Sequence, residues 1–393
     1  MPLTPRERVL AAIHHQEPDR VPIVIGVSNA TSMKMKPYRE LKQLLGIAAP
    51  DEYLYEWPEL GTAAPDEAVL HRLRSDVRGV LDLEPAHILA YNRQRRQTDP
   101  HANFIDSWGS GQIELAPGEW LPGVNPLRAA TTIAEIRDYP GWPDMRDPTR
   151  VAHVRAQAQK LRAETDYAIM GTPWLLFPFE RAHAMQGLDQ FLLNMAMQPD
   201  LAVALLQRIT EACKALMDAF LAECGDLIDI IKIGDDLGMQ SGLLISPKMY
   251  RQQLKPIHAD YIAHIKSRTA AKVFFHTDGD VMDLIPDFIE IGVDILNPIQ
   301  TSAGRMSDLP ELKRRFGQDI VFCGAIDTQR ILPFGTPQQV RQEVKRVIEI
   351  MAPGGGYLLS SVHTIMNDVS AENVLAMVDA VEAFGQYPLG SRS

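Results

Sequence analysis

Short apolar stretches alternate with longer helical stretches along most of this chain, and that alternation restricts the fold more than any other feature. Seven apolar stretches have the length and composition of strands buried on both faces: 21–25, 167–171, 228–233, 272–276, 293–296, 320–324 and 357–361. The stretches between them carry apolar residues at helical spacing, as at 199–224, 337–351 and 371–384. The alternation predicts an α/β fold with a parallel sheet.

The chain of 393 residues, 46% of them hydrophobic, is long enough for one (β/α)8 TIM barrel with an N-terminal extension and loop insertions. We expect the eighth strand between residues 75 and 110. Residues from about 50 to 150 lack the regular alternation and contain clustered Trp, Gly and Pro. We interpret this stretch as an irregular insertion or lid within a single domain that spans residues 1–393.

The net charge of the chain is −11, from 39 basic and 50 acidic residues, and no basic run occurs. Nucleic-acid binding is therefore not expected. The three cysteines, Cys213, Cys224 and Cys323, form no CxxC pair, which argues against a disulfide framework. No apolar run is long enough to span a membrane, and the N-terminus lacks the apolar core of a signal peptide. We expect a soluble cytoplasmic protein.

Polar residues follow most of the predicted strands, where a TIM barrel carries its functional side chains. These residues are Asp235, Asp236, His276, Asp278, Asn297, Asp327 and His363. His276 and Asp278 are two residues apart, so both side chains can point the same way from an extended segment. An imidazole and a carboxylate so placed can bind a metal or position a proton. The alternative is a buried histidine that a neighbouring carboxylate satisfies.

Several motifs resemble those of the uroporphyrinogen decarboxylase superfamily, and the resemblance covers nearly the whole chain. They are Arg20-Val21-Pro22-Ile23, Asp294-Ile295-Leu296-Asn297-Pro298, Gly324-Ala325-Ile326-Asp327, Pro353-Gly354-Gly355-Gly356-Tyr357 and Ala371-Glu372-Asn373-Val374. The resemblance implies a distorted TIM barrel. The decarboxylase branch carries an N-terminal segment with two arginines that receive substrate carboxylates. Residues 26–34 of this chain contain no arginine, and this departure argues against uroporphyrinogen decarboxylation.

The chain is more similar to the other branch, the corrinoid-dependent methyltransferases, which usually hold zinc. Their pattern is His-x-Cys after one strand and a further Cys after the last strand. His276 matches the histidine, Asp278 and His363 take the places of the two cysteines, and His363 stands ten residues before Asn373. The resemblance implies a divalent metal, usually zinc in that branch, bound by His276, Asp278 and His363. Nitrogen and oxygen ligands are harder than thiolate and favour polarising an oxygen.

We therefore expect a metal-dependent methyltransferase that demethylates a small methoxy-type donor and passes the methyl group to a corrinoid on a partner protein. Asp278 is the expected catalytic residue, together with Asp235 and Asp236, either of which could instead cap the next segment. Gln240, Asn297 and Asp327 are expected to bind substrate. The resemblance also implies a homodimer. Two alternatives stay open: a uroporphyrinogen decarboxylase-like enzyme with His276 or Asp278 as proton donor, and a non-catalytic protein that binds a tetrapyrrole or corrinoid.

Overall fold

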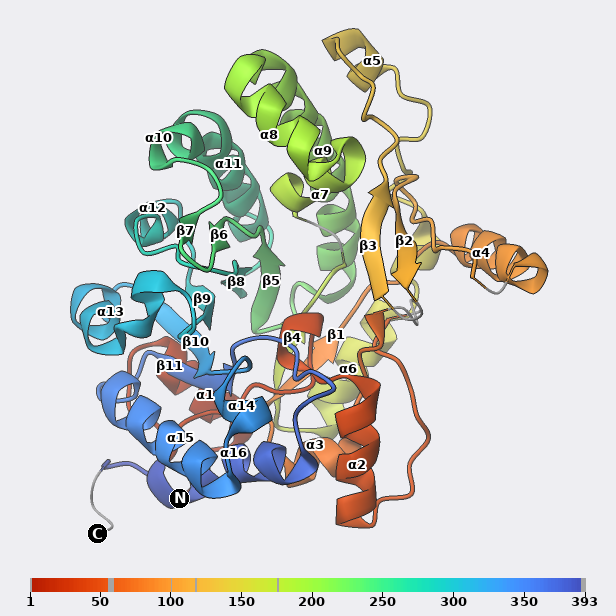
Figure 1. Ribbon diagram of the computed structural model, residues 1–393. Helices are drawn as coiled ribbons and strands as arrows, with labels where there is room; N and C mark the ends of the chain where they lie inside the picture. The colour runs from red at the N-terminus through yellow and green to blue at the C-terminus, as the bar shows by residue number, and fades with distance from the viewer. Residues whose placement is uncertain (1, 56–59, 100, 117–118, 175–176, 390–393) are drawn as a thin grey trace.

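Seven parallel strands form a curled sheet at the centre of the molecule (Figure 1). The computed structural model describes residues 2–55, 60–99, 101–116, 119–174 and 177–389. Neighbouring strands of the sheet, in spatial order, are β1 (Val77–Val80), β4 (Ala168–Gly171), β5 (Ile230–Gly234), β8 (Lys272–His276), β9 (Ile295–Ile299), β10 (Val321–Ile326) and β11 (Tyr357–Ser361). All six pairings are parallel. The predicted α/β class and parallel sheet are confirmed, and β1 is the strand expected between residues 75 and 110.

The expected strand at residues 21–25 is not a regular strand. Its backbone makes an isolated parallel bridge from Ile23 to Leu359, and the Val24 N–H donates to the Leu359 carbonyl oxygen over 2.9 Å. On its other side, the Asp76 N–H donates to the Ile23 carbonyl oxygen over 2.9 Å. The segment thus lies between β11 and the start of β1. Because Pro22 has no N–H to donate, a full hydrogen-bond ladder cannot form there, and the regular sheet has seven strands in a TIM-barrel-like arrangement.

An apolar cluster fills the interior of the curled sheet. Alternate residues of successive strands contribute to it, including Ile230, Phe274, Ile295 and Leu358. Helix α1 (Pro5–Ile13) closes the amino end of the strands with Val9, Ala12 and Ile13. The polar chemistry must therefore lie at the opposite, carboxyl end.

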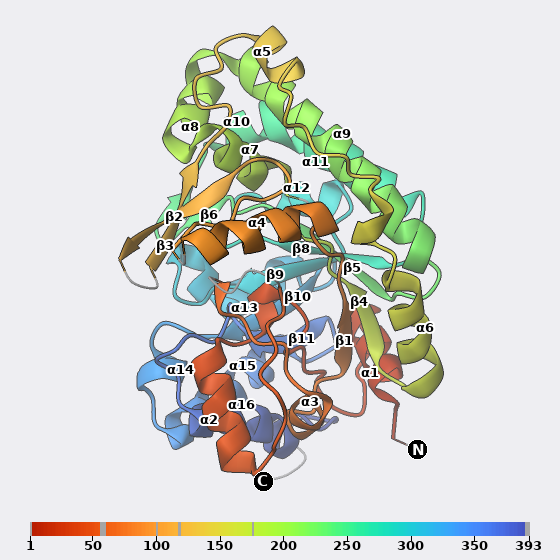
Figure 2. The ribbon, with the colours of Figure 1, turned by 90° about the vertical axis from the view of Figure 1, so that its right-hand side faces the viewer.

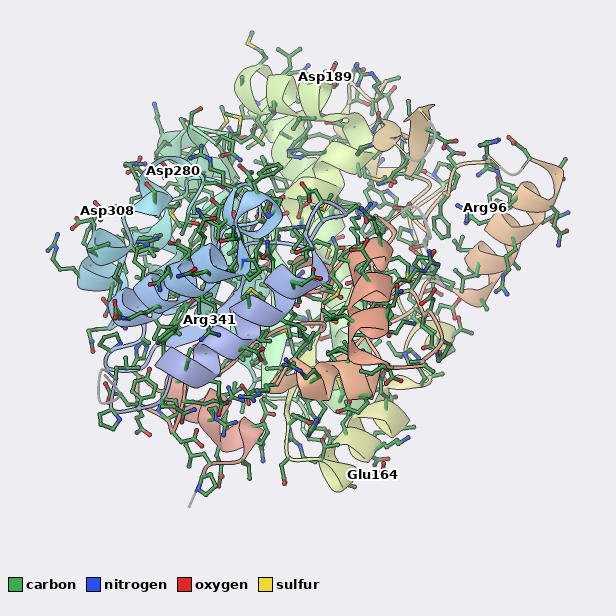
Figure 3. The ribbon with its side chains drawn as sticks, turned by 60° about the horizontal axis from the view of Figure 1, so that its bottom comes forward. Arg96, Glu164, Asp189, Asp280, Asp308 and Arg341 are labelled. Carbon is green, nitrogen blue, oxygen red and sulfur yellow. The ribbon has the colours of Figure 1, made fainter. Side chains whose placement is uncertain are left out.

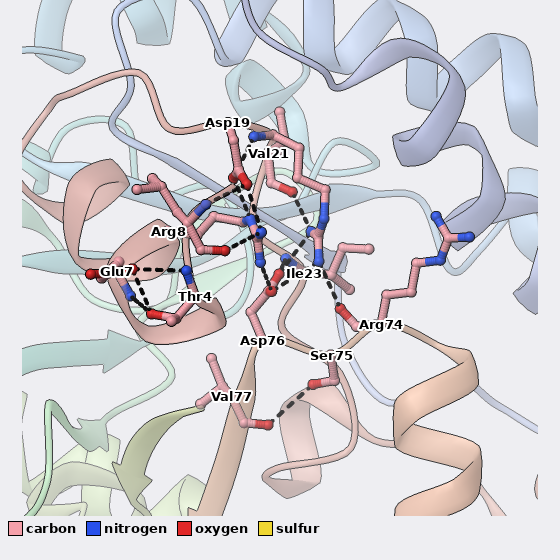
Figure 4. Close-up of polar contacts among 12 residues, drawn as sticks. Thr4, Glu7, Arg8, Asp19, Val21, Ile23, Arg74, Ser75, Asp76 and Val77 are labelled. Atoms are coloured by element: carbon pink, nitrogen blue, oxygen red, sulfur yellow. Dashed lines mark hydrogen bonds and ion pairs between the residues drawn. The ribbon is translucent and has the colours of Figure 1, made fainter. Parts of the chain in front are cut away.

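A buried carboxylate joins helix α1 and residues 20–23 to the first strand (Figure 4). Asp76 accepts hydrogen bonds from Arg8 Nη1 at 2.7 Å, Arg20 Nη1 at 2.8 Å and the Ile23 N–H at 2.8 Å. A carboxylate that accepts several charge-assisted bonds away from water is a strong local constraint. This contact fixes the segment beside β11 and β1, at the end of the sheet away from the polar strand ends.

Helices surround the sheet, and most connect one of its strands to the next (Figures 1 and 2). Beyond α1 they are α2 (Met35–Leu45), α3 (Glu67–Arg72), α4 (Ala86–Thr98), α5 (Ile133–Arg137), α6 (Val154–Glu164), α7 (Pro178–Gln186), α8 (Leu188–Met197), α9 (Pro199–Cys224), α10 (Pro247–Met249), α11 (Lys255–Lys266), α12 (Ile285–Glu290), α13 (Leu309–Phe316), α14 (Ile331–Phe334), α15 (Pro337–Met351) and α16 (Ala371–Phe384). A π-helical turn, Tyr250–Leu254, separates α10 from α11. Since Pro256 cannot donate to the preceding turn, the α-helical hydrogen-bond pattern changes to the π pattern there, and the helical backbone continues from Pro247 to Lys266. Among the described helices, none combines the length and apolarity needed to cross a membrane.

Regular elements occur within the stretch that we expected to be an irregular insertion. Strands β2 (Gly111–Ala116) and β3 (Glu119–Val124) form an antiparallel hairpin, and α4, with Arg96 labelled in Figure 3, projects from the flank of the molecule. A second small hairpin, β6 (Gly238–Met239) and β7 (Gly242–Leu243), follows β5. The single-domain boundary at residues 1–393 remains a prediction.

Candidate metal centre

A cavity of about 280 Å³ lies at the carboxyl ends of the strands. Its wall includes His276, the last residue of β8, His363, which follows β11, and Asp236, which follows β5. Trp174 and Phe177 form an aromatic part of the wall, whereas Trp108 is buried in the core. Three of the seven polar residues expected after the strands, Asp236, His276 and His363, thus line this cavity.

His276, Asp278 and His363 converge beside the cavity. One ligand atom from each residue lies within 4.8 Å of the other two. The Asp278 Oδ2 atom is 3.9 Å from His276 Nε2 and 3.8 Å from His363 Nε2. These separations are too long for hydrogen bonds, but they suit ligands on different sides of one ion, each about 2.0–2.2 Å from zinc. The three residues that the sequence proposed as metal ligands are thus brought together from two strands.

Asn297 orients the His276 ring. The Nδ1 atom of His276 lies 2.7 Å from Asn297 Oδ1, and the Asn297 amide nitrogen donates to the Cys323 carbonyl oxygen over 3.4 Å. Because that amide oxygen can only accept, Nδ1 carries the proton and Nε2 keeps its lone pair. A metal-binding histidine commonly has such a partner on its other nitrogen.

Burial keeps both imidazoles neutral. It lowers the pKa of His276 well below its usual value, with a further contribution from the positive charge of Lys232. It lowers the pKa of His363 to about 4, again with Lys232 contributing. Neutral imidazole is the form that binds a metal.

Two carboxylates crowd the same space. Asp236 Oδ1 accepts the Asp278 N–H over 2.9 Å and lies 3.9 Å from His276 Nε2. Burial raises the pKa of Asp278 well above its usual value, and the nearby charge of Asp236 raises it further. Asp278 Oδ1 is buried and has no hydrogen-bond partner among the described residues. A cation between the carboxylates and the imidazoles would supply the missing partner.

Sequence reasoning missed two charged residues of the cavity, Lys232 and Glu180. Burial lowers the pKa of the Lys232 ammonium to about 8, and burial together with Asp236 raises the pKa of Glu180 well above its usual value. A lysine inside the otherwise apolar strand β5 was a readable signal. Glu180 had none, because helix α7 was not predicted. With Asp236 and Asp278, the four groups carry a formal charge that a divalent cation would neutralise.

A family model described as "Uroporphyrinogen decarboxylase (URO-D)" matches residues 112–384. The chain belongs to the URO-D family. The resemblance that the motifs indicated is therefore confirmed.

Relatives of this URO-D family chain carry two kinds of name. Uroporphyrinogen decarboxylase from Alkalilimnicola ehrlichii is 25% identical over 97% of this chain and 94% of its own length. Methylated-thiol–coenzyme M methyltransferase from Methanosarcina mazei is 24% identical over 53% of either chain. A solved methyltransferase from Methanosarcina mazei superposes with a TM-score of 0.65 at 20% identity, covering 97% of this chain and 99% of its own. That likeness establishes the fold alone.

Asp235, expected to be catalytic in this URO-D family chain, does not line the cavity. Its carboxylate accepts the backbone N–H groups of Phe179 at 2.9 Å and Glu180 at 2.8 Å, and His258 Nε2 lies 2.8 Å from it. It therefore holds the first turn of α7, which carries Glu180. The geometry gives Asp235 a positioning role, and a direct catalytic role remains a prediction.

Gln240 and Asp327 also lie outside the cavity wall. Gln240 is exposed in the turn between β6 and β7. Asp327 accepts the backbone N–H groups of Gln329 at 2.5 Å and Arg330 at 2.9 Å and so caps the turn that follows β10. Cys323 is buried in the apolar interior, and its thiol has a pKa raised by burial to about 12. Substrate binding by Gln240 and Asp327 remains a prediction without a contact in this cavity.

Proposed function

We propose that this chain is a metal-dependent methyltransferase that removes the methyl group from a small methoxy-type donor. The proposed acceptor is the reduced corrinoid of a partner protein, as the sequence's similarity to that branch implies. The convergence of His276, Asp278 and His363 is the observation that supports the proposal most strongly. The methyltransferase name of one relative is consistent with it. The cytoplasmic location and the homodimer stay predictions.

The residues present fit a divalent metal, with zinc the first candidate. The donor set is two neutral imidazoles and a carboxylate with an unpartnered buried oxygen, and Asp236 lies within reach as a further oxygen ligand. A metal bound there would supply Lewis acidity toward the oxygen of the donor. Asn297 would keep the His276 ring oriented, and the aromatic wall would place the donor and exclude water.

Metal analysis of the purified protein tests this proposal. We expect about one equivalent of a divalent metal in the wild-type protein, and its loss in a His276→Ala/His363→Ala double variant. His71→Ala is the matched control, since His71 is exposed on helix α3. The reaction is then tested by supplying a methyl ether and free Co(I) cobalamin. Transfer of the methyl group to cobalt is measured as the loss of the Co(I) absorbance. Wild-type metal content in the double variant would remove the basis of the proposal.

The second candidate is a decarboxylase, which is favoured by the names of relatives that match over most of the chain. Two observations count against a polycarboxylated tetrapyrrole substrate. The cavity, at about 280 Å³, lies just below the roughly 300–1,000 Å³ usual for ligand sites. Its arginine, Arg181, is already paired with Asp106 at 2.6 Å. Decarboxylation of uroporphyrinogen by the metal-free protein would favour this second function.

A further inference from the structure

Lys232 projects into the interior of the sheet, just below the candidate metal ligands. In the parallel register, Lys232 pairs with Phe274 and Gly234 pairs with His276. Because side chains alternate along a strand, Lys232 shares its face with Ile230, a member of the interior apolar cluster. The next residue on that face, Gly234, has no side chain to block the path. The lysine therefore reaches the cavity that His276 also lines.

The Lys232 ammonium makes no direct contact with a charged group in the part of the chain that the structure describes. Among the described residues it makes no ion pair within 4.0 Å and no hydrogen bond, and its recorded contact is the Phe177 ring, whose centroid is 4.7 Å from Nζ. Arg181, the other cation of the wall, donates to Asp106 at 2.6 Å and to Ser110 at 2.7 Å. Lys232 itself is only 7% exposed. A buried ammonium is costly unless something satisfies it, so its three N–H groups are available to a ligand in the cavity.

We propose that Lys232 is a catalytic residue that donates a proton to the oxygen from which the methyl group departs. This assignment rests on the proposed function. As the carbon–oxygen bond breaks, its electron pair stays on oxygen, which takes one proton from the Lys232 ammonium and leaves as a neutral hydroxyl compound. The methyl carbon forms its new bond with the electron pair of the reduced corrinoid of the partner. Solvent later returns a proton to the neutral amine.

The charge of the cavity is consistent with such a donor. A divalent metal would neutralise the formal charge of Lys232, Glu180, Asp236 and Asp278 taken together. The charge left without compensation is then the negative charge that develops on the leaving oxygen. The Lys232 ammonium, which is buried and has N–H groups to donate, lies beside it. A donor works best when its pKa is near the operating pH, and the lowered pKa of Lys232, about 8, meets that condition.

The wall of the cavity points to an aromatic methyl ether as the donor. Trp174 and Phe177 supply aromatic surface, and the Tyr55 ring supports Trp174 from behind at a centroid distance of 4.1 Å. Apolar side chains from Ala30, Leu60 and Ala184 complete this side. A single ring can stack there, and the volume of about 280 Å³ leaves little room for more.

A series of aryl methyl ethers tests the assignment, because a proton donor matters most when the leaving phenol is weakly acidic. We would compare wild-type protein with Lys232→Met and Lys232→Arg on methoxybenzene and on 4-nitromethoxybenzene. We expect Lys232→Met to slow the demethylation of methoxybenzene by about 10²–10⁴-fold and to slow the demethylation of 4-nitromethoxybenzene far less. Lys232→Arg should not rescue methoxybenzene, because a guanidinium keeps its charge but does not release its proton. Equal slowing of both ethers, or rescue by arginine, would overturn the proposal.

A binding measurement separates this proposal from the proposed function. Bound 4-nitrophenol reports its own ionisation by absorbance, in metal-free protein and without a corrinoid. We expect the apparent pKa of the bound phenol to be lower in the wild-type protein and in Lys232→Arg than in Lys232→Met. If no ether is demethylated but this shift is present, the proposed function fails and contact of Lys232 with a phenolic oxygen stands. If the apparent pKa of the bound phenol is the same in a folded Lys232→Met variant as in the wild-type protein, the role of Lys232 is overturned whatever the activity.

Discussion

His276 and Asn297 form a hydrogen bond of 2.7 Å between Nδ1 and Oδ1, and the bond directs the other ring nitrogen toward Asp278. His276 is the last residue of β8 and Asn297 lies in the neighbouring strand β9, and the two residues pair directly in the parallel register. The strand pairing itself therefore places the hydrogen-bond partner of His276. Asn297, which the sequence suggested as a substrate-binding residue, acts here on the histidine.

Replacing Asn297 should weaken metal binding without removing a ligand. We expect Asn297→Ala to lower the affinity about 10–100-fold, the usual cost of losing such a partner, as measured by competition with a chelator. Asn297→Asp keeps an acceptor for Nδ1 and should retain most of the affinity. Gln240→Ala, at an exposed position, is the control. Equal affinity in Asn297→Ala and the wild-type protein would contradict the orienting role.

The strand-end pattern placed His276, Asp278 and His363 among seven candidates, and the resemblance to the methyltransferase branch selected these three as proposed metal ligands. His276 and His363 follow strands whose apolar runs are easy to recognise, and the parallel register brings their ends to one rim. The same rule also selected Asp235 and Asp327, whose carboxylates instead accept backbone N–H groups. The sequence does not distinguish a strand-end carboxylate that faces a cavity from one that accepts backbone N–H groups. For Asp235 those N–H groups come from helix α7, far away in the sequence, and for Asp327 they come from the turn that follows it.

The missed features have physical causes too. Lys232 was counted as part of a buried strand, and its direction depends on the register with β8. Residues 21–25 have a strand's composition, yet Pro22 limits their pairing to isolated bonds. A lysine in an apolar strand and a proline in a short strand were both readable locally, but the face on which Lys232 lies and the bonds left to residues 21–25 depend on strands remote in sequence.

Removing the charge of Asp278 should stabilise the metal-free protein at neutral pH. The pKa of Asp278 is raised in the folded state, so the folded protein holds this proton more tightly than the unfolded chain. Its contribution to stability is then lost as pH rises from about 4, the pKa in the unfolded chain. We expect the free energy of unfolding of metal-free Asp278→Asn to exceed that of the metal-free wild type at pH 7, with the gap closing toward pH 4. Urea unfolding at several pH values measures this difference in the free energy of unfolding. A difference that does not change with pH would contradict the raised pKa of Asp278.

Metal binding should release a proton from Asp278. Since the raised pKa means that the metal-free site holds this proton more tightly than a free carboxylate does, and a ligating carboxylate must be ionised, the two events are coupled. Titration calorimetry with zinc, in buffers of different ionisation enthalpy and at several pH values, should show proton release by the wild-type protein that falls as the pH rises. The histidines should add little, because burial lowers the His363 pKa to about 4 and the His276 pKa well below its usual value. Heats that do not depend on the buffer would count against Asp278 as a ligand.

Truncating Asp235 should destabilise the fold far more than truncating an exposed acid. Its carboxylate is fully buried and satisfies two N–H groups of α7, with His258 beside it. Removing one partner of a buried charged contact commonly costs about 3–5 kcal/mol, and we expect a loss of that order for Asp235→Ala in urea unfolding. The control Asp226→Ala, in an exposed pair with Arg155, should cost no more than about 1 kcal/mol. If Asp235 only positions α7, folded Asp235→Asn should keep its metal and lose activity through the displaced Glu180. Loss of metal from a folded Asp235→Asn variant would instead tie this carboxylate to the metal centre.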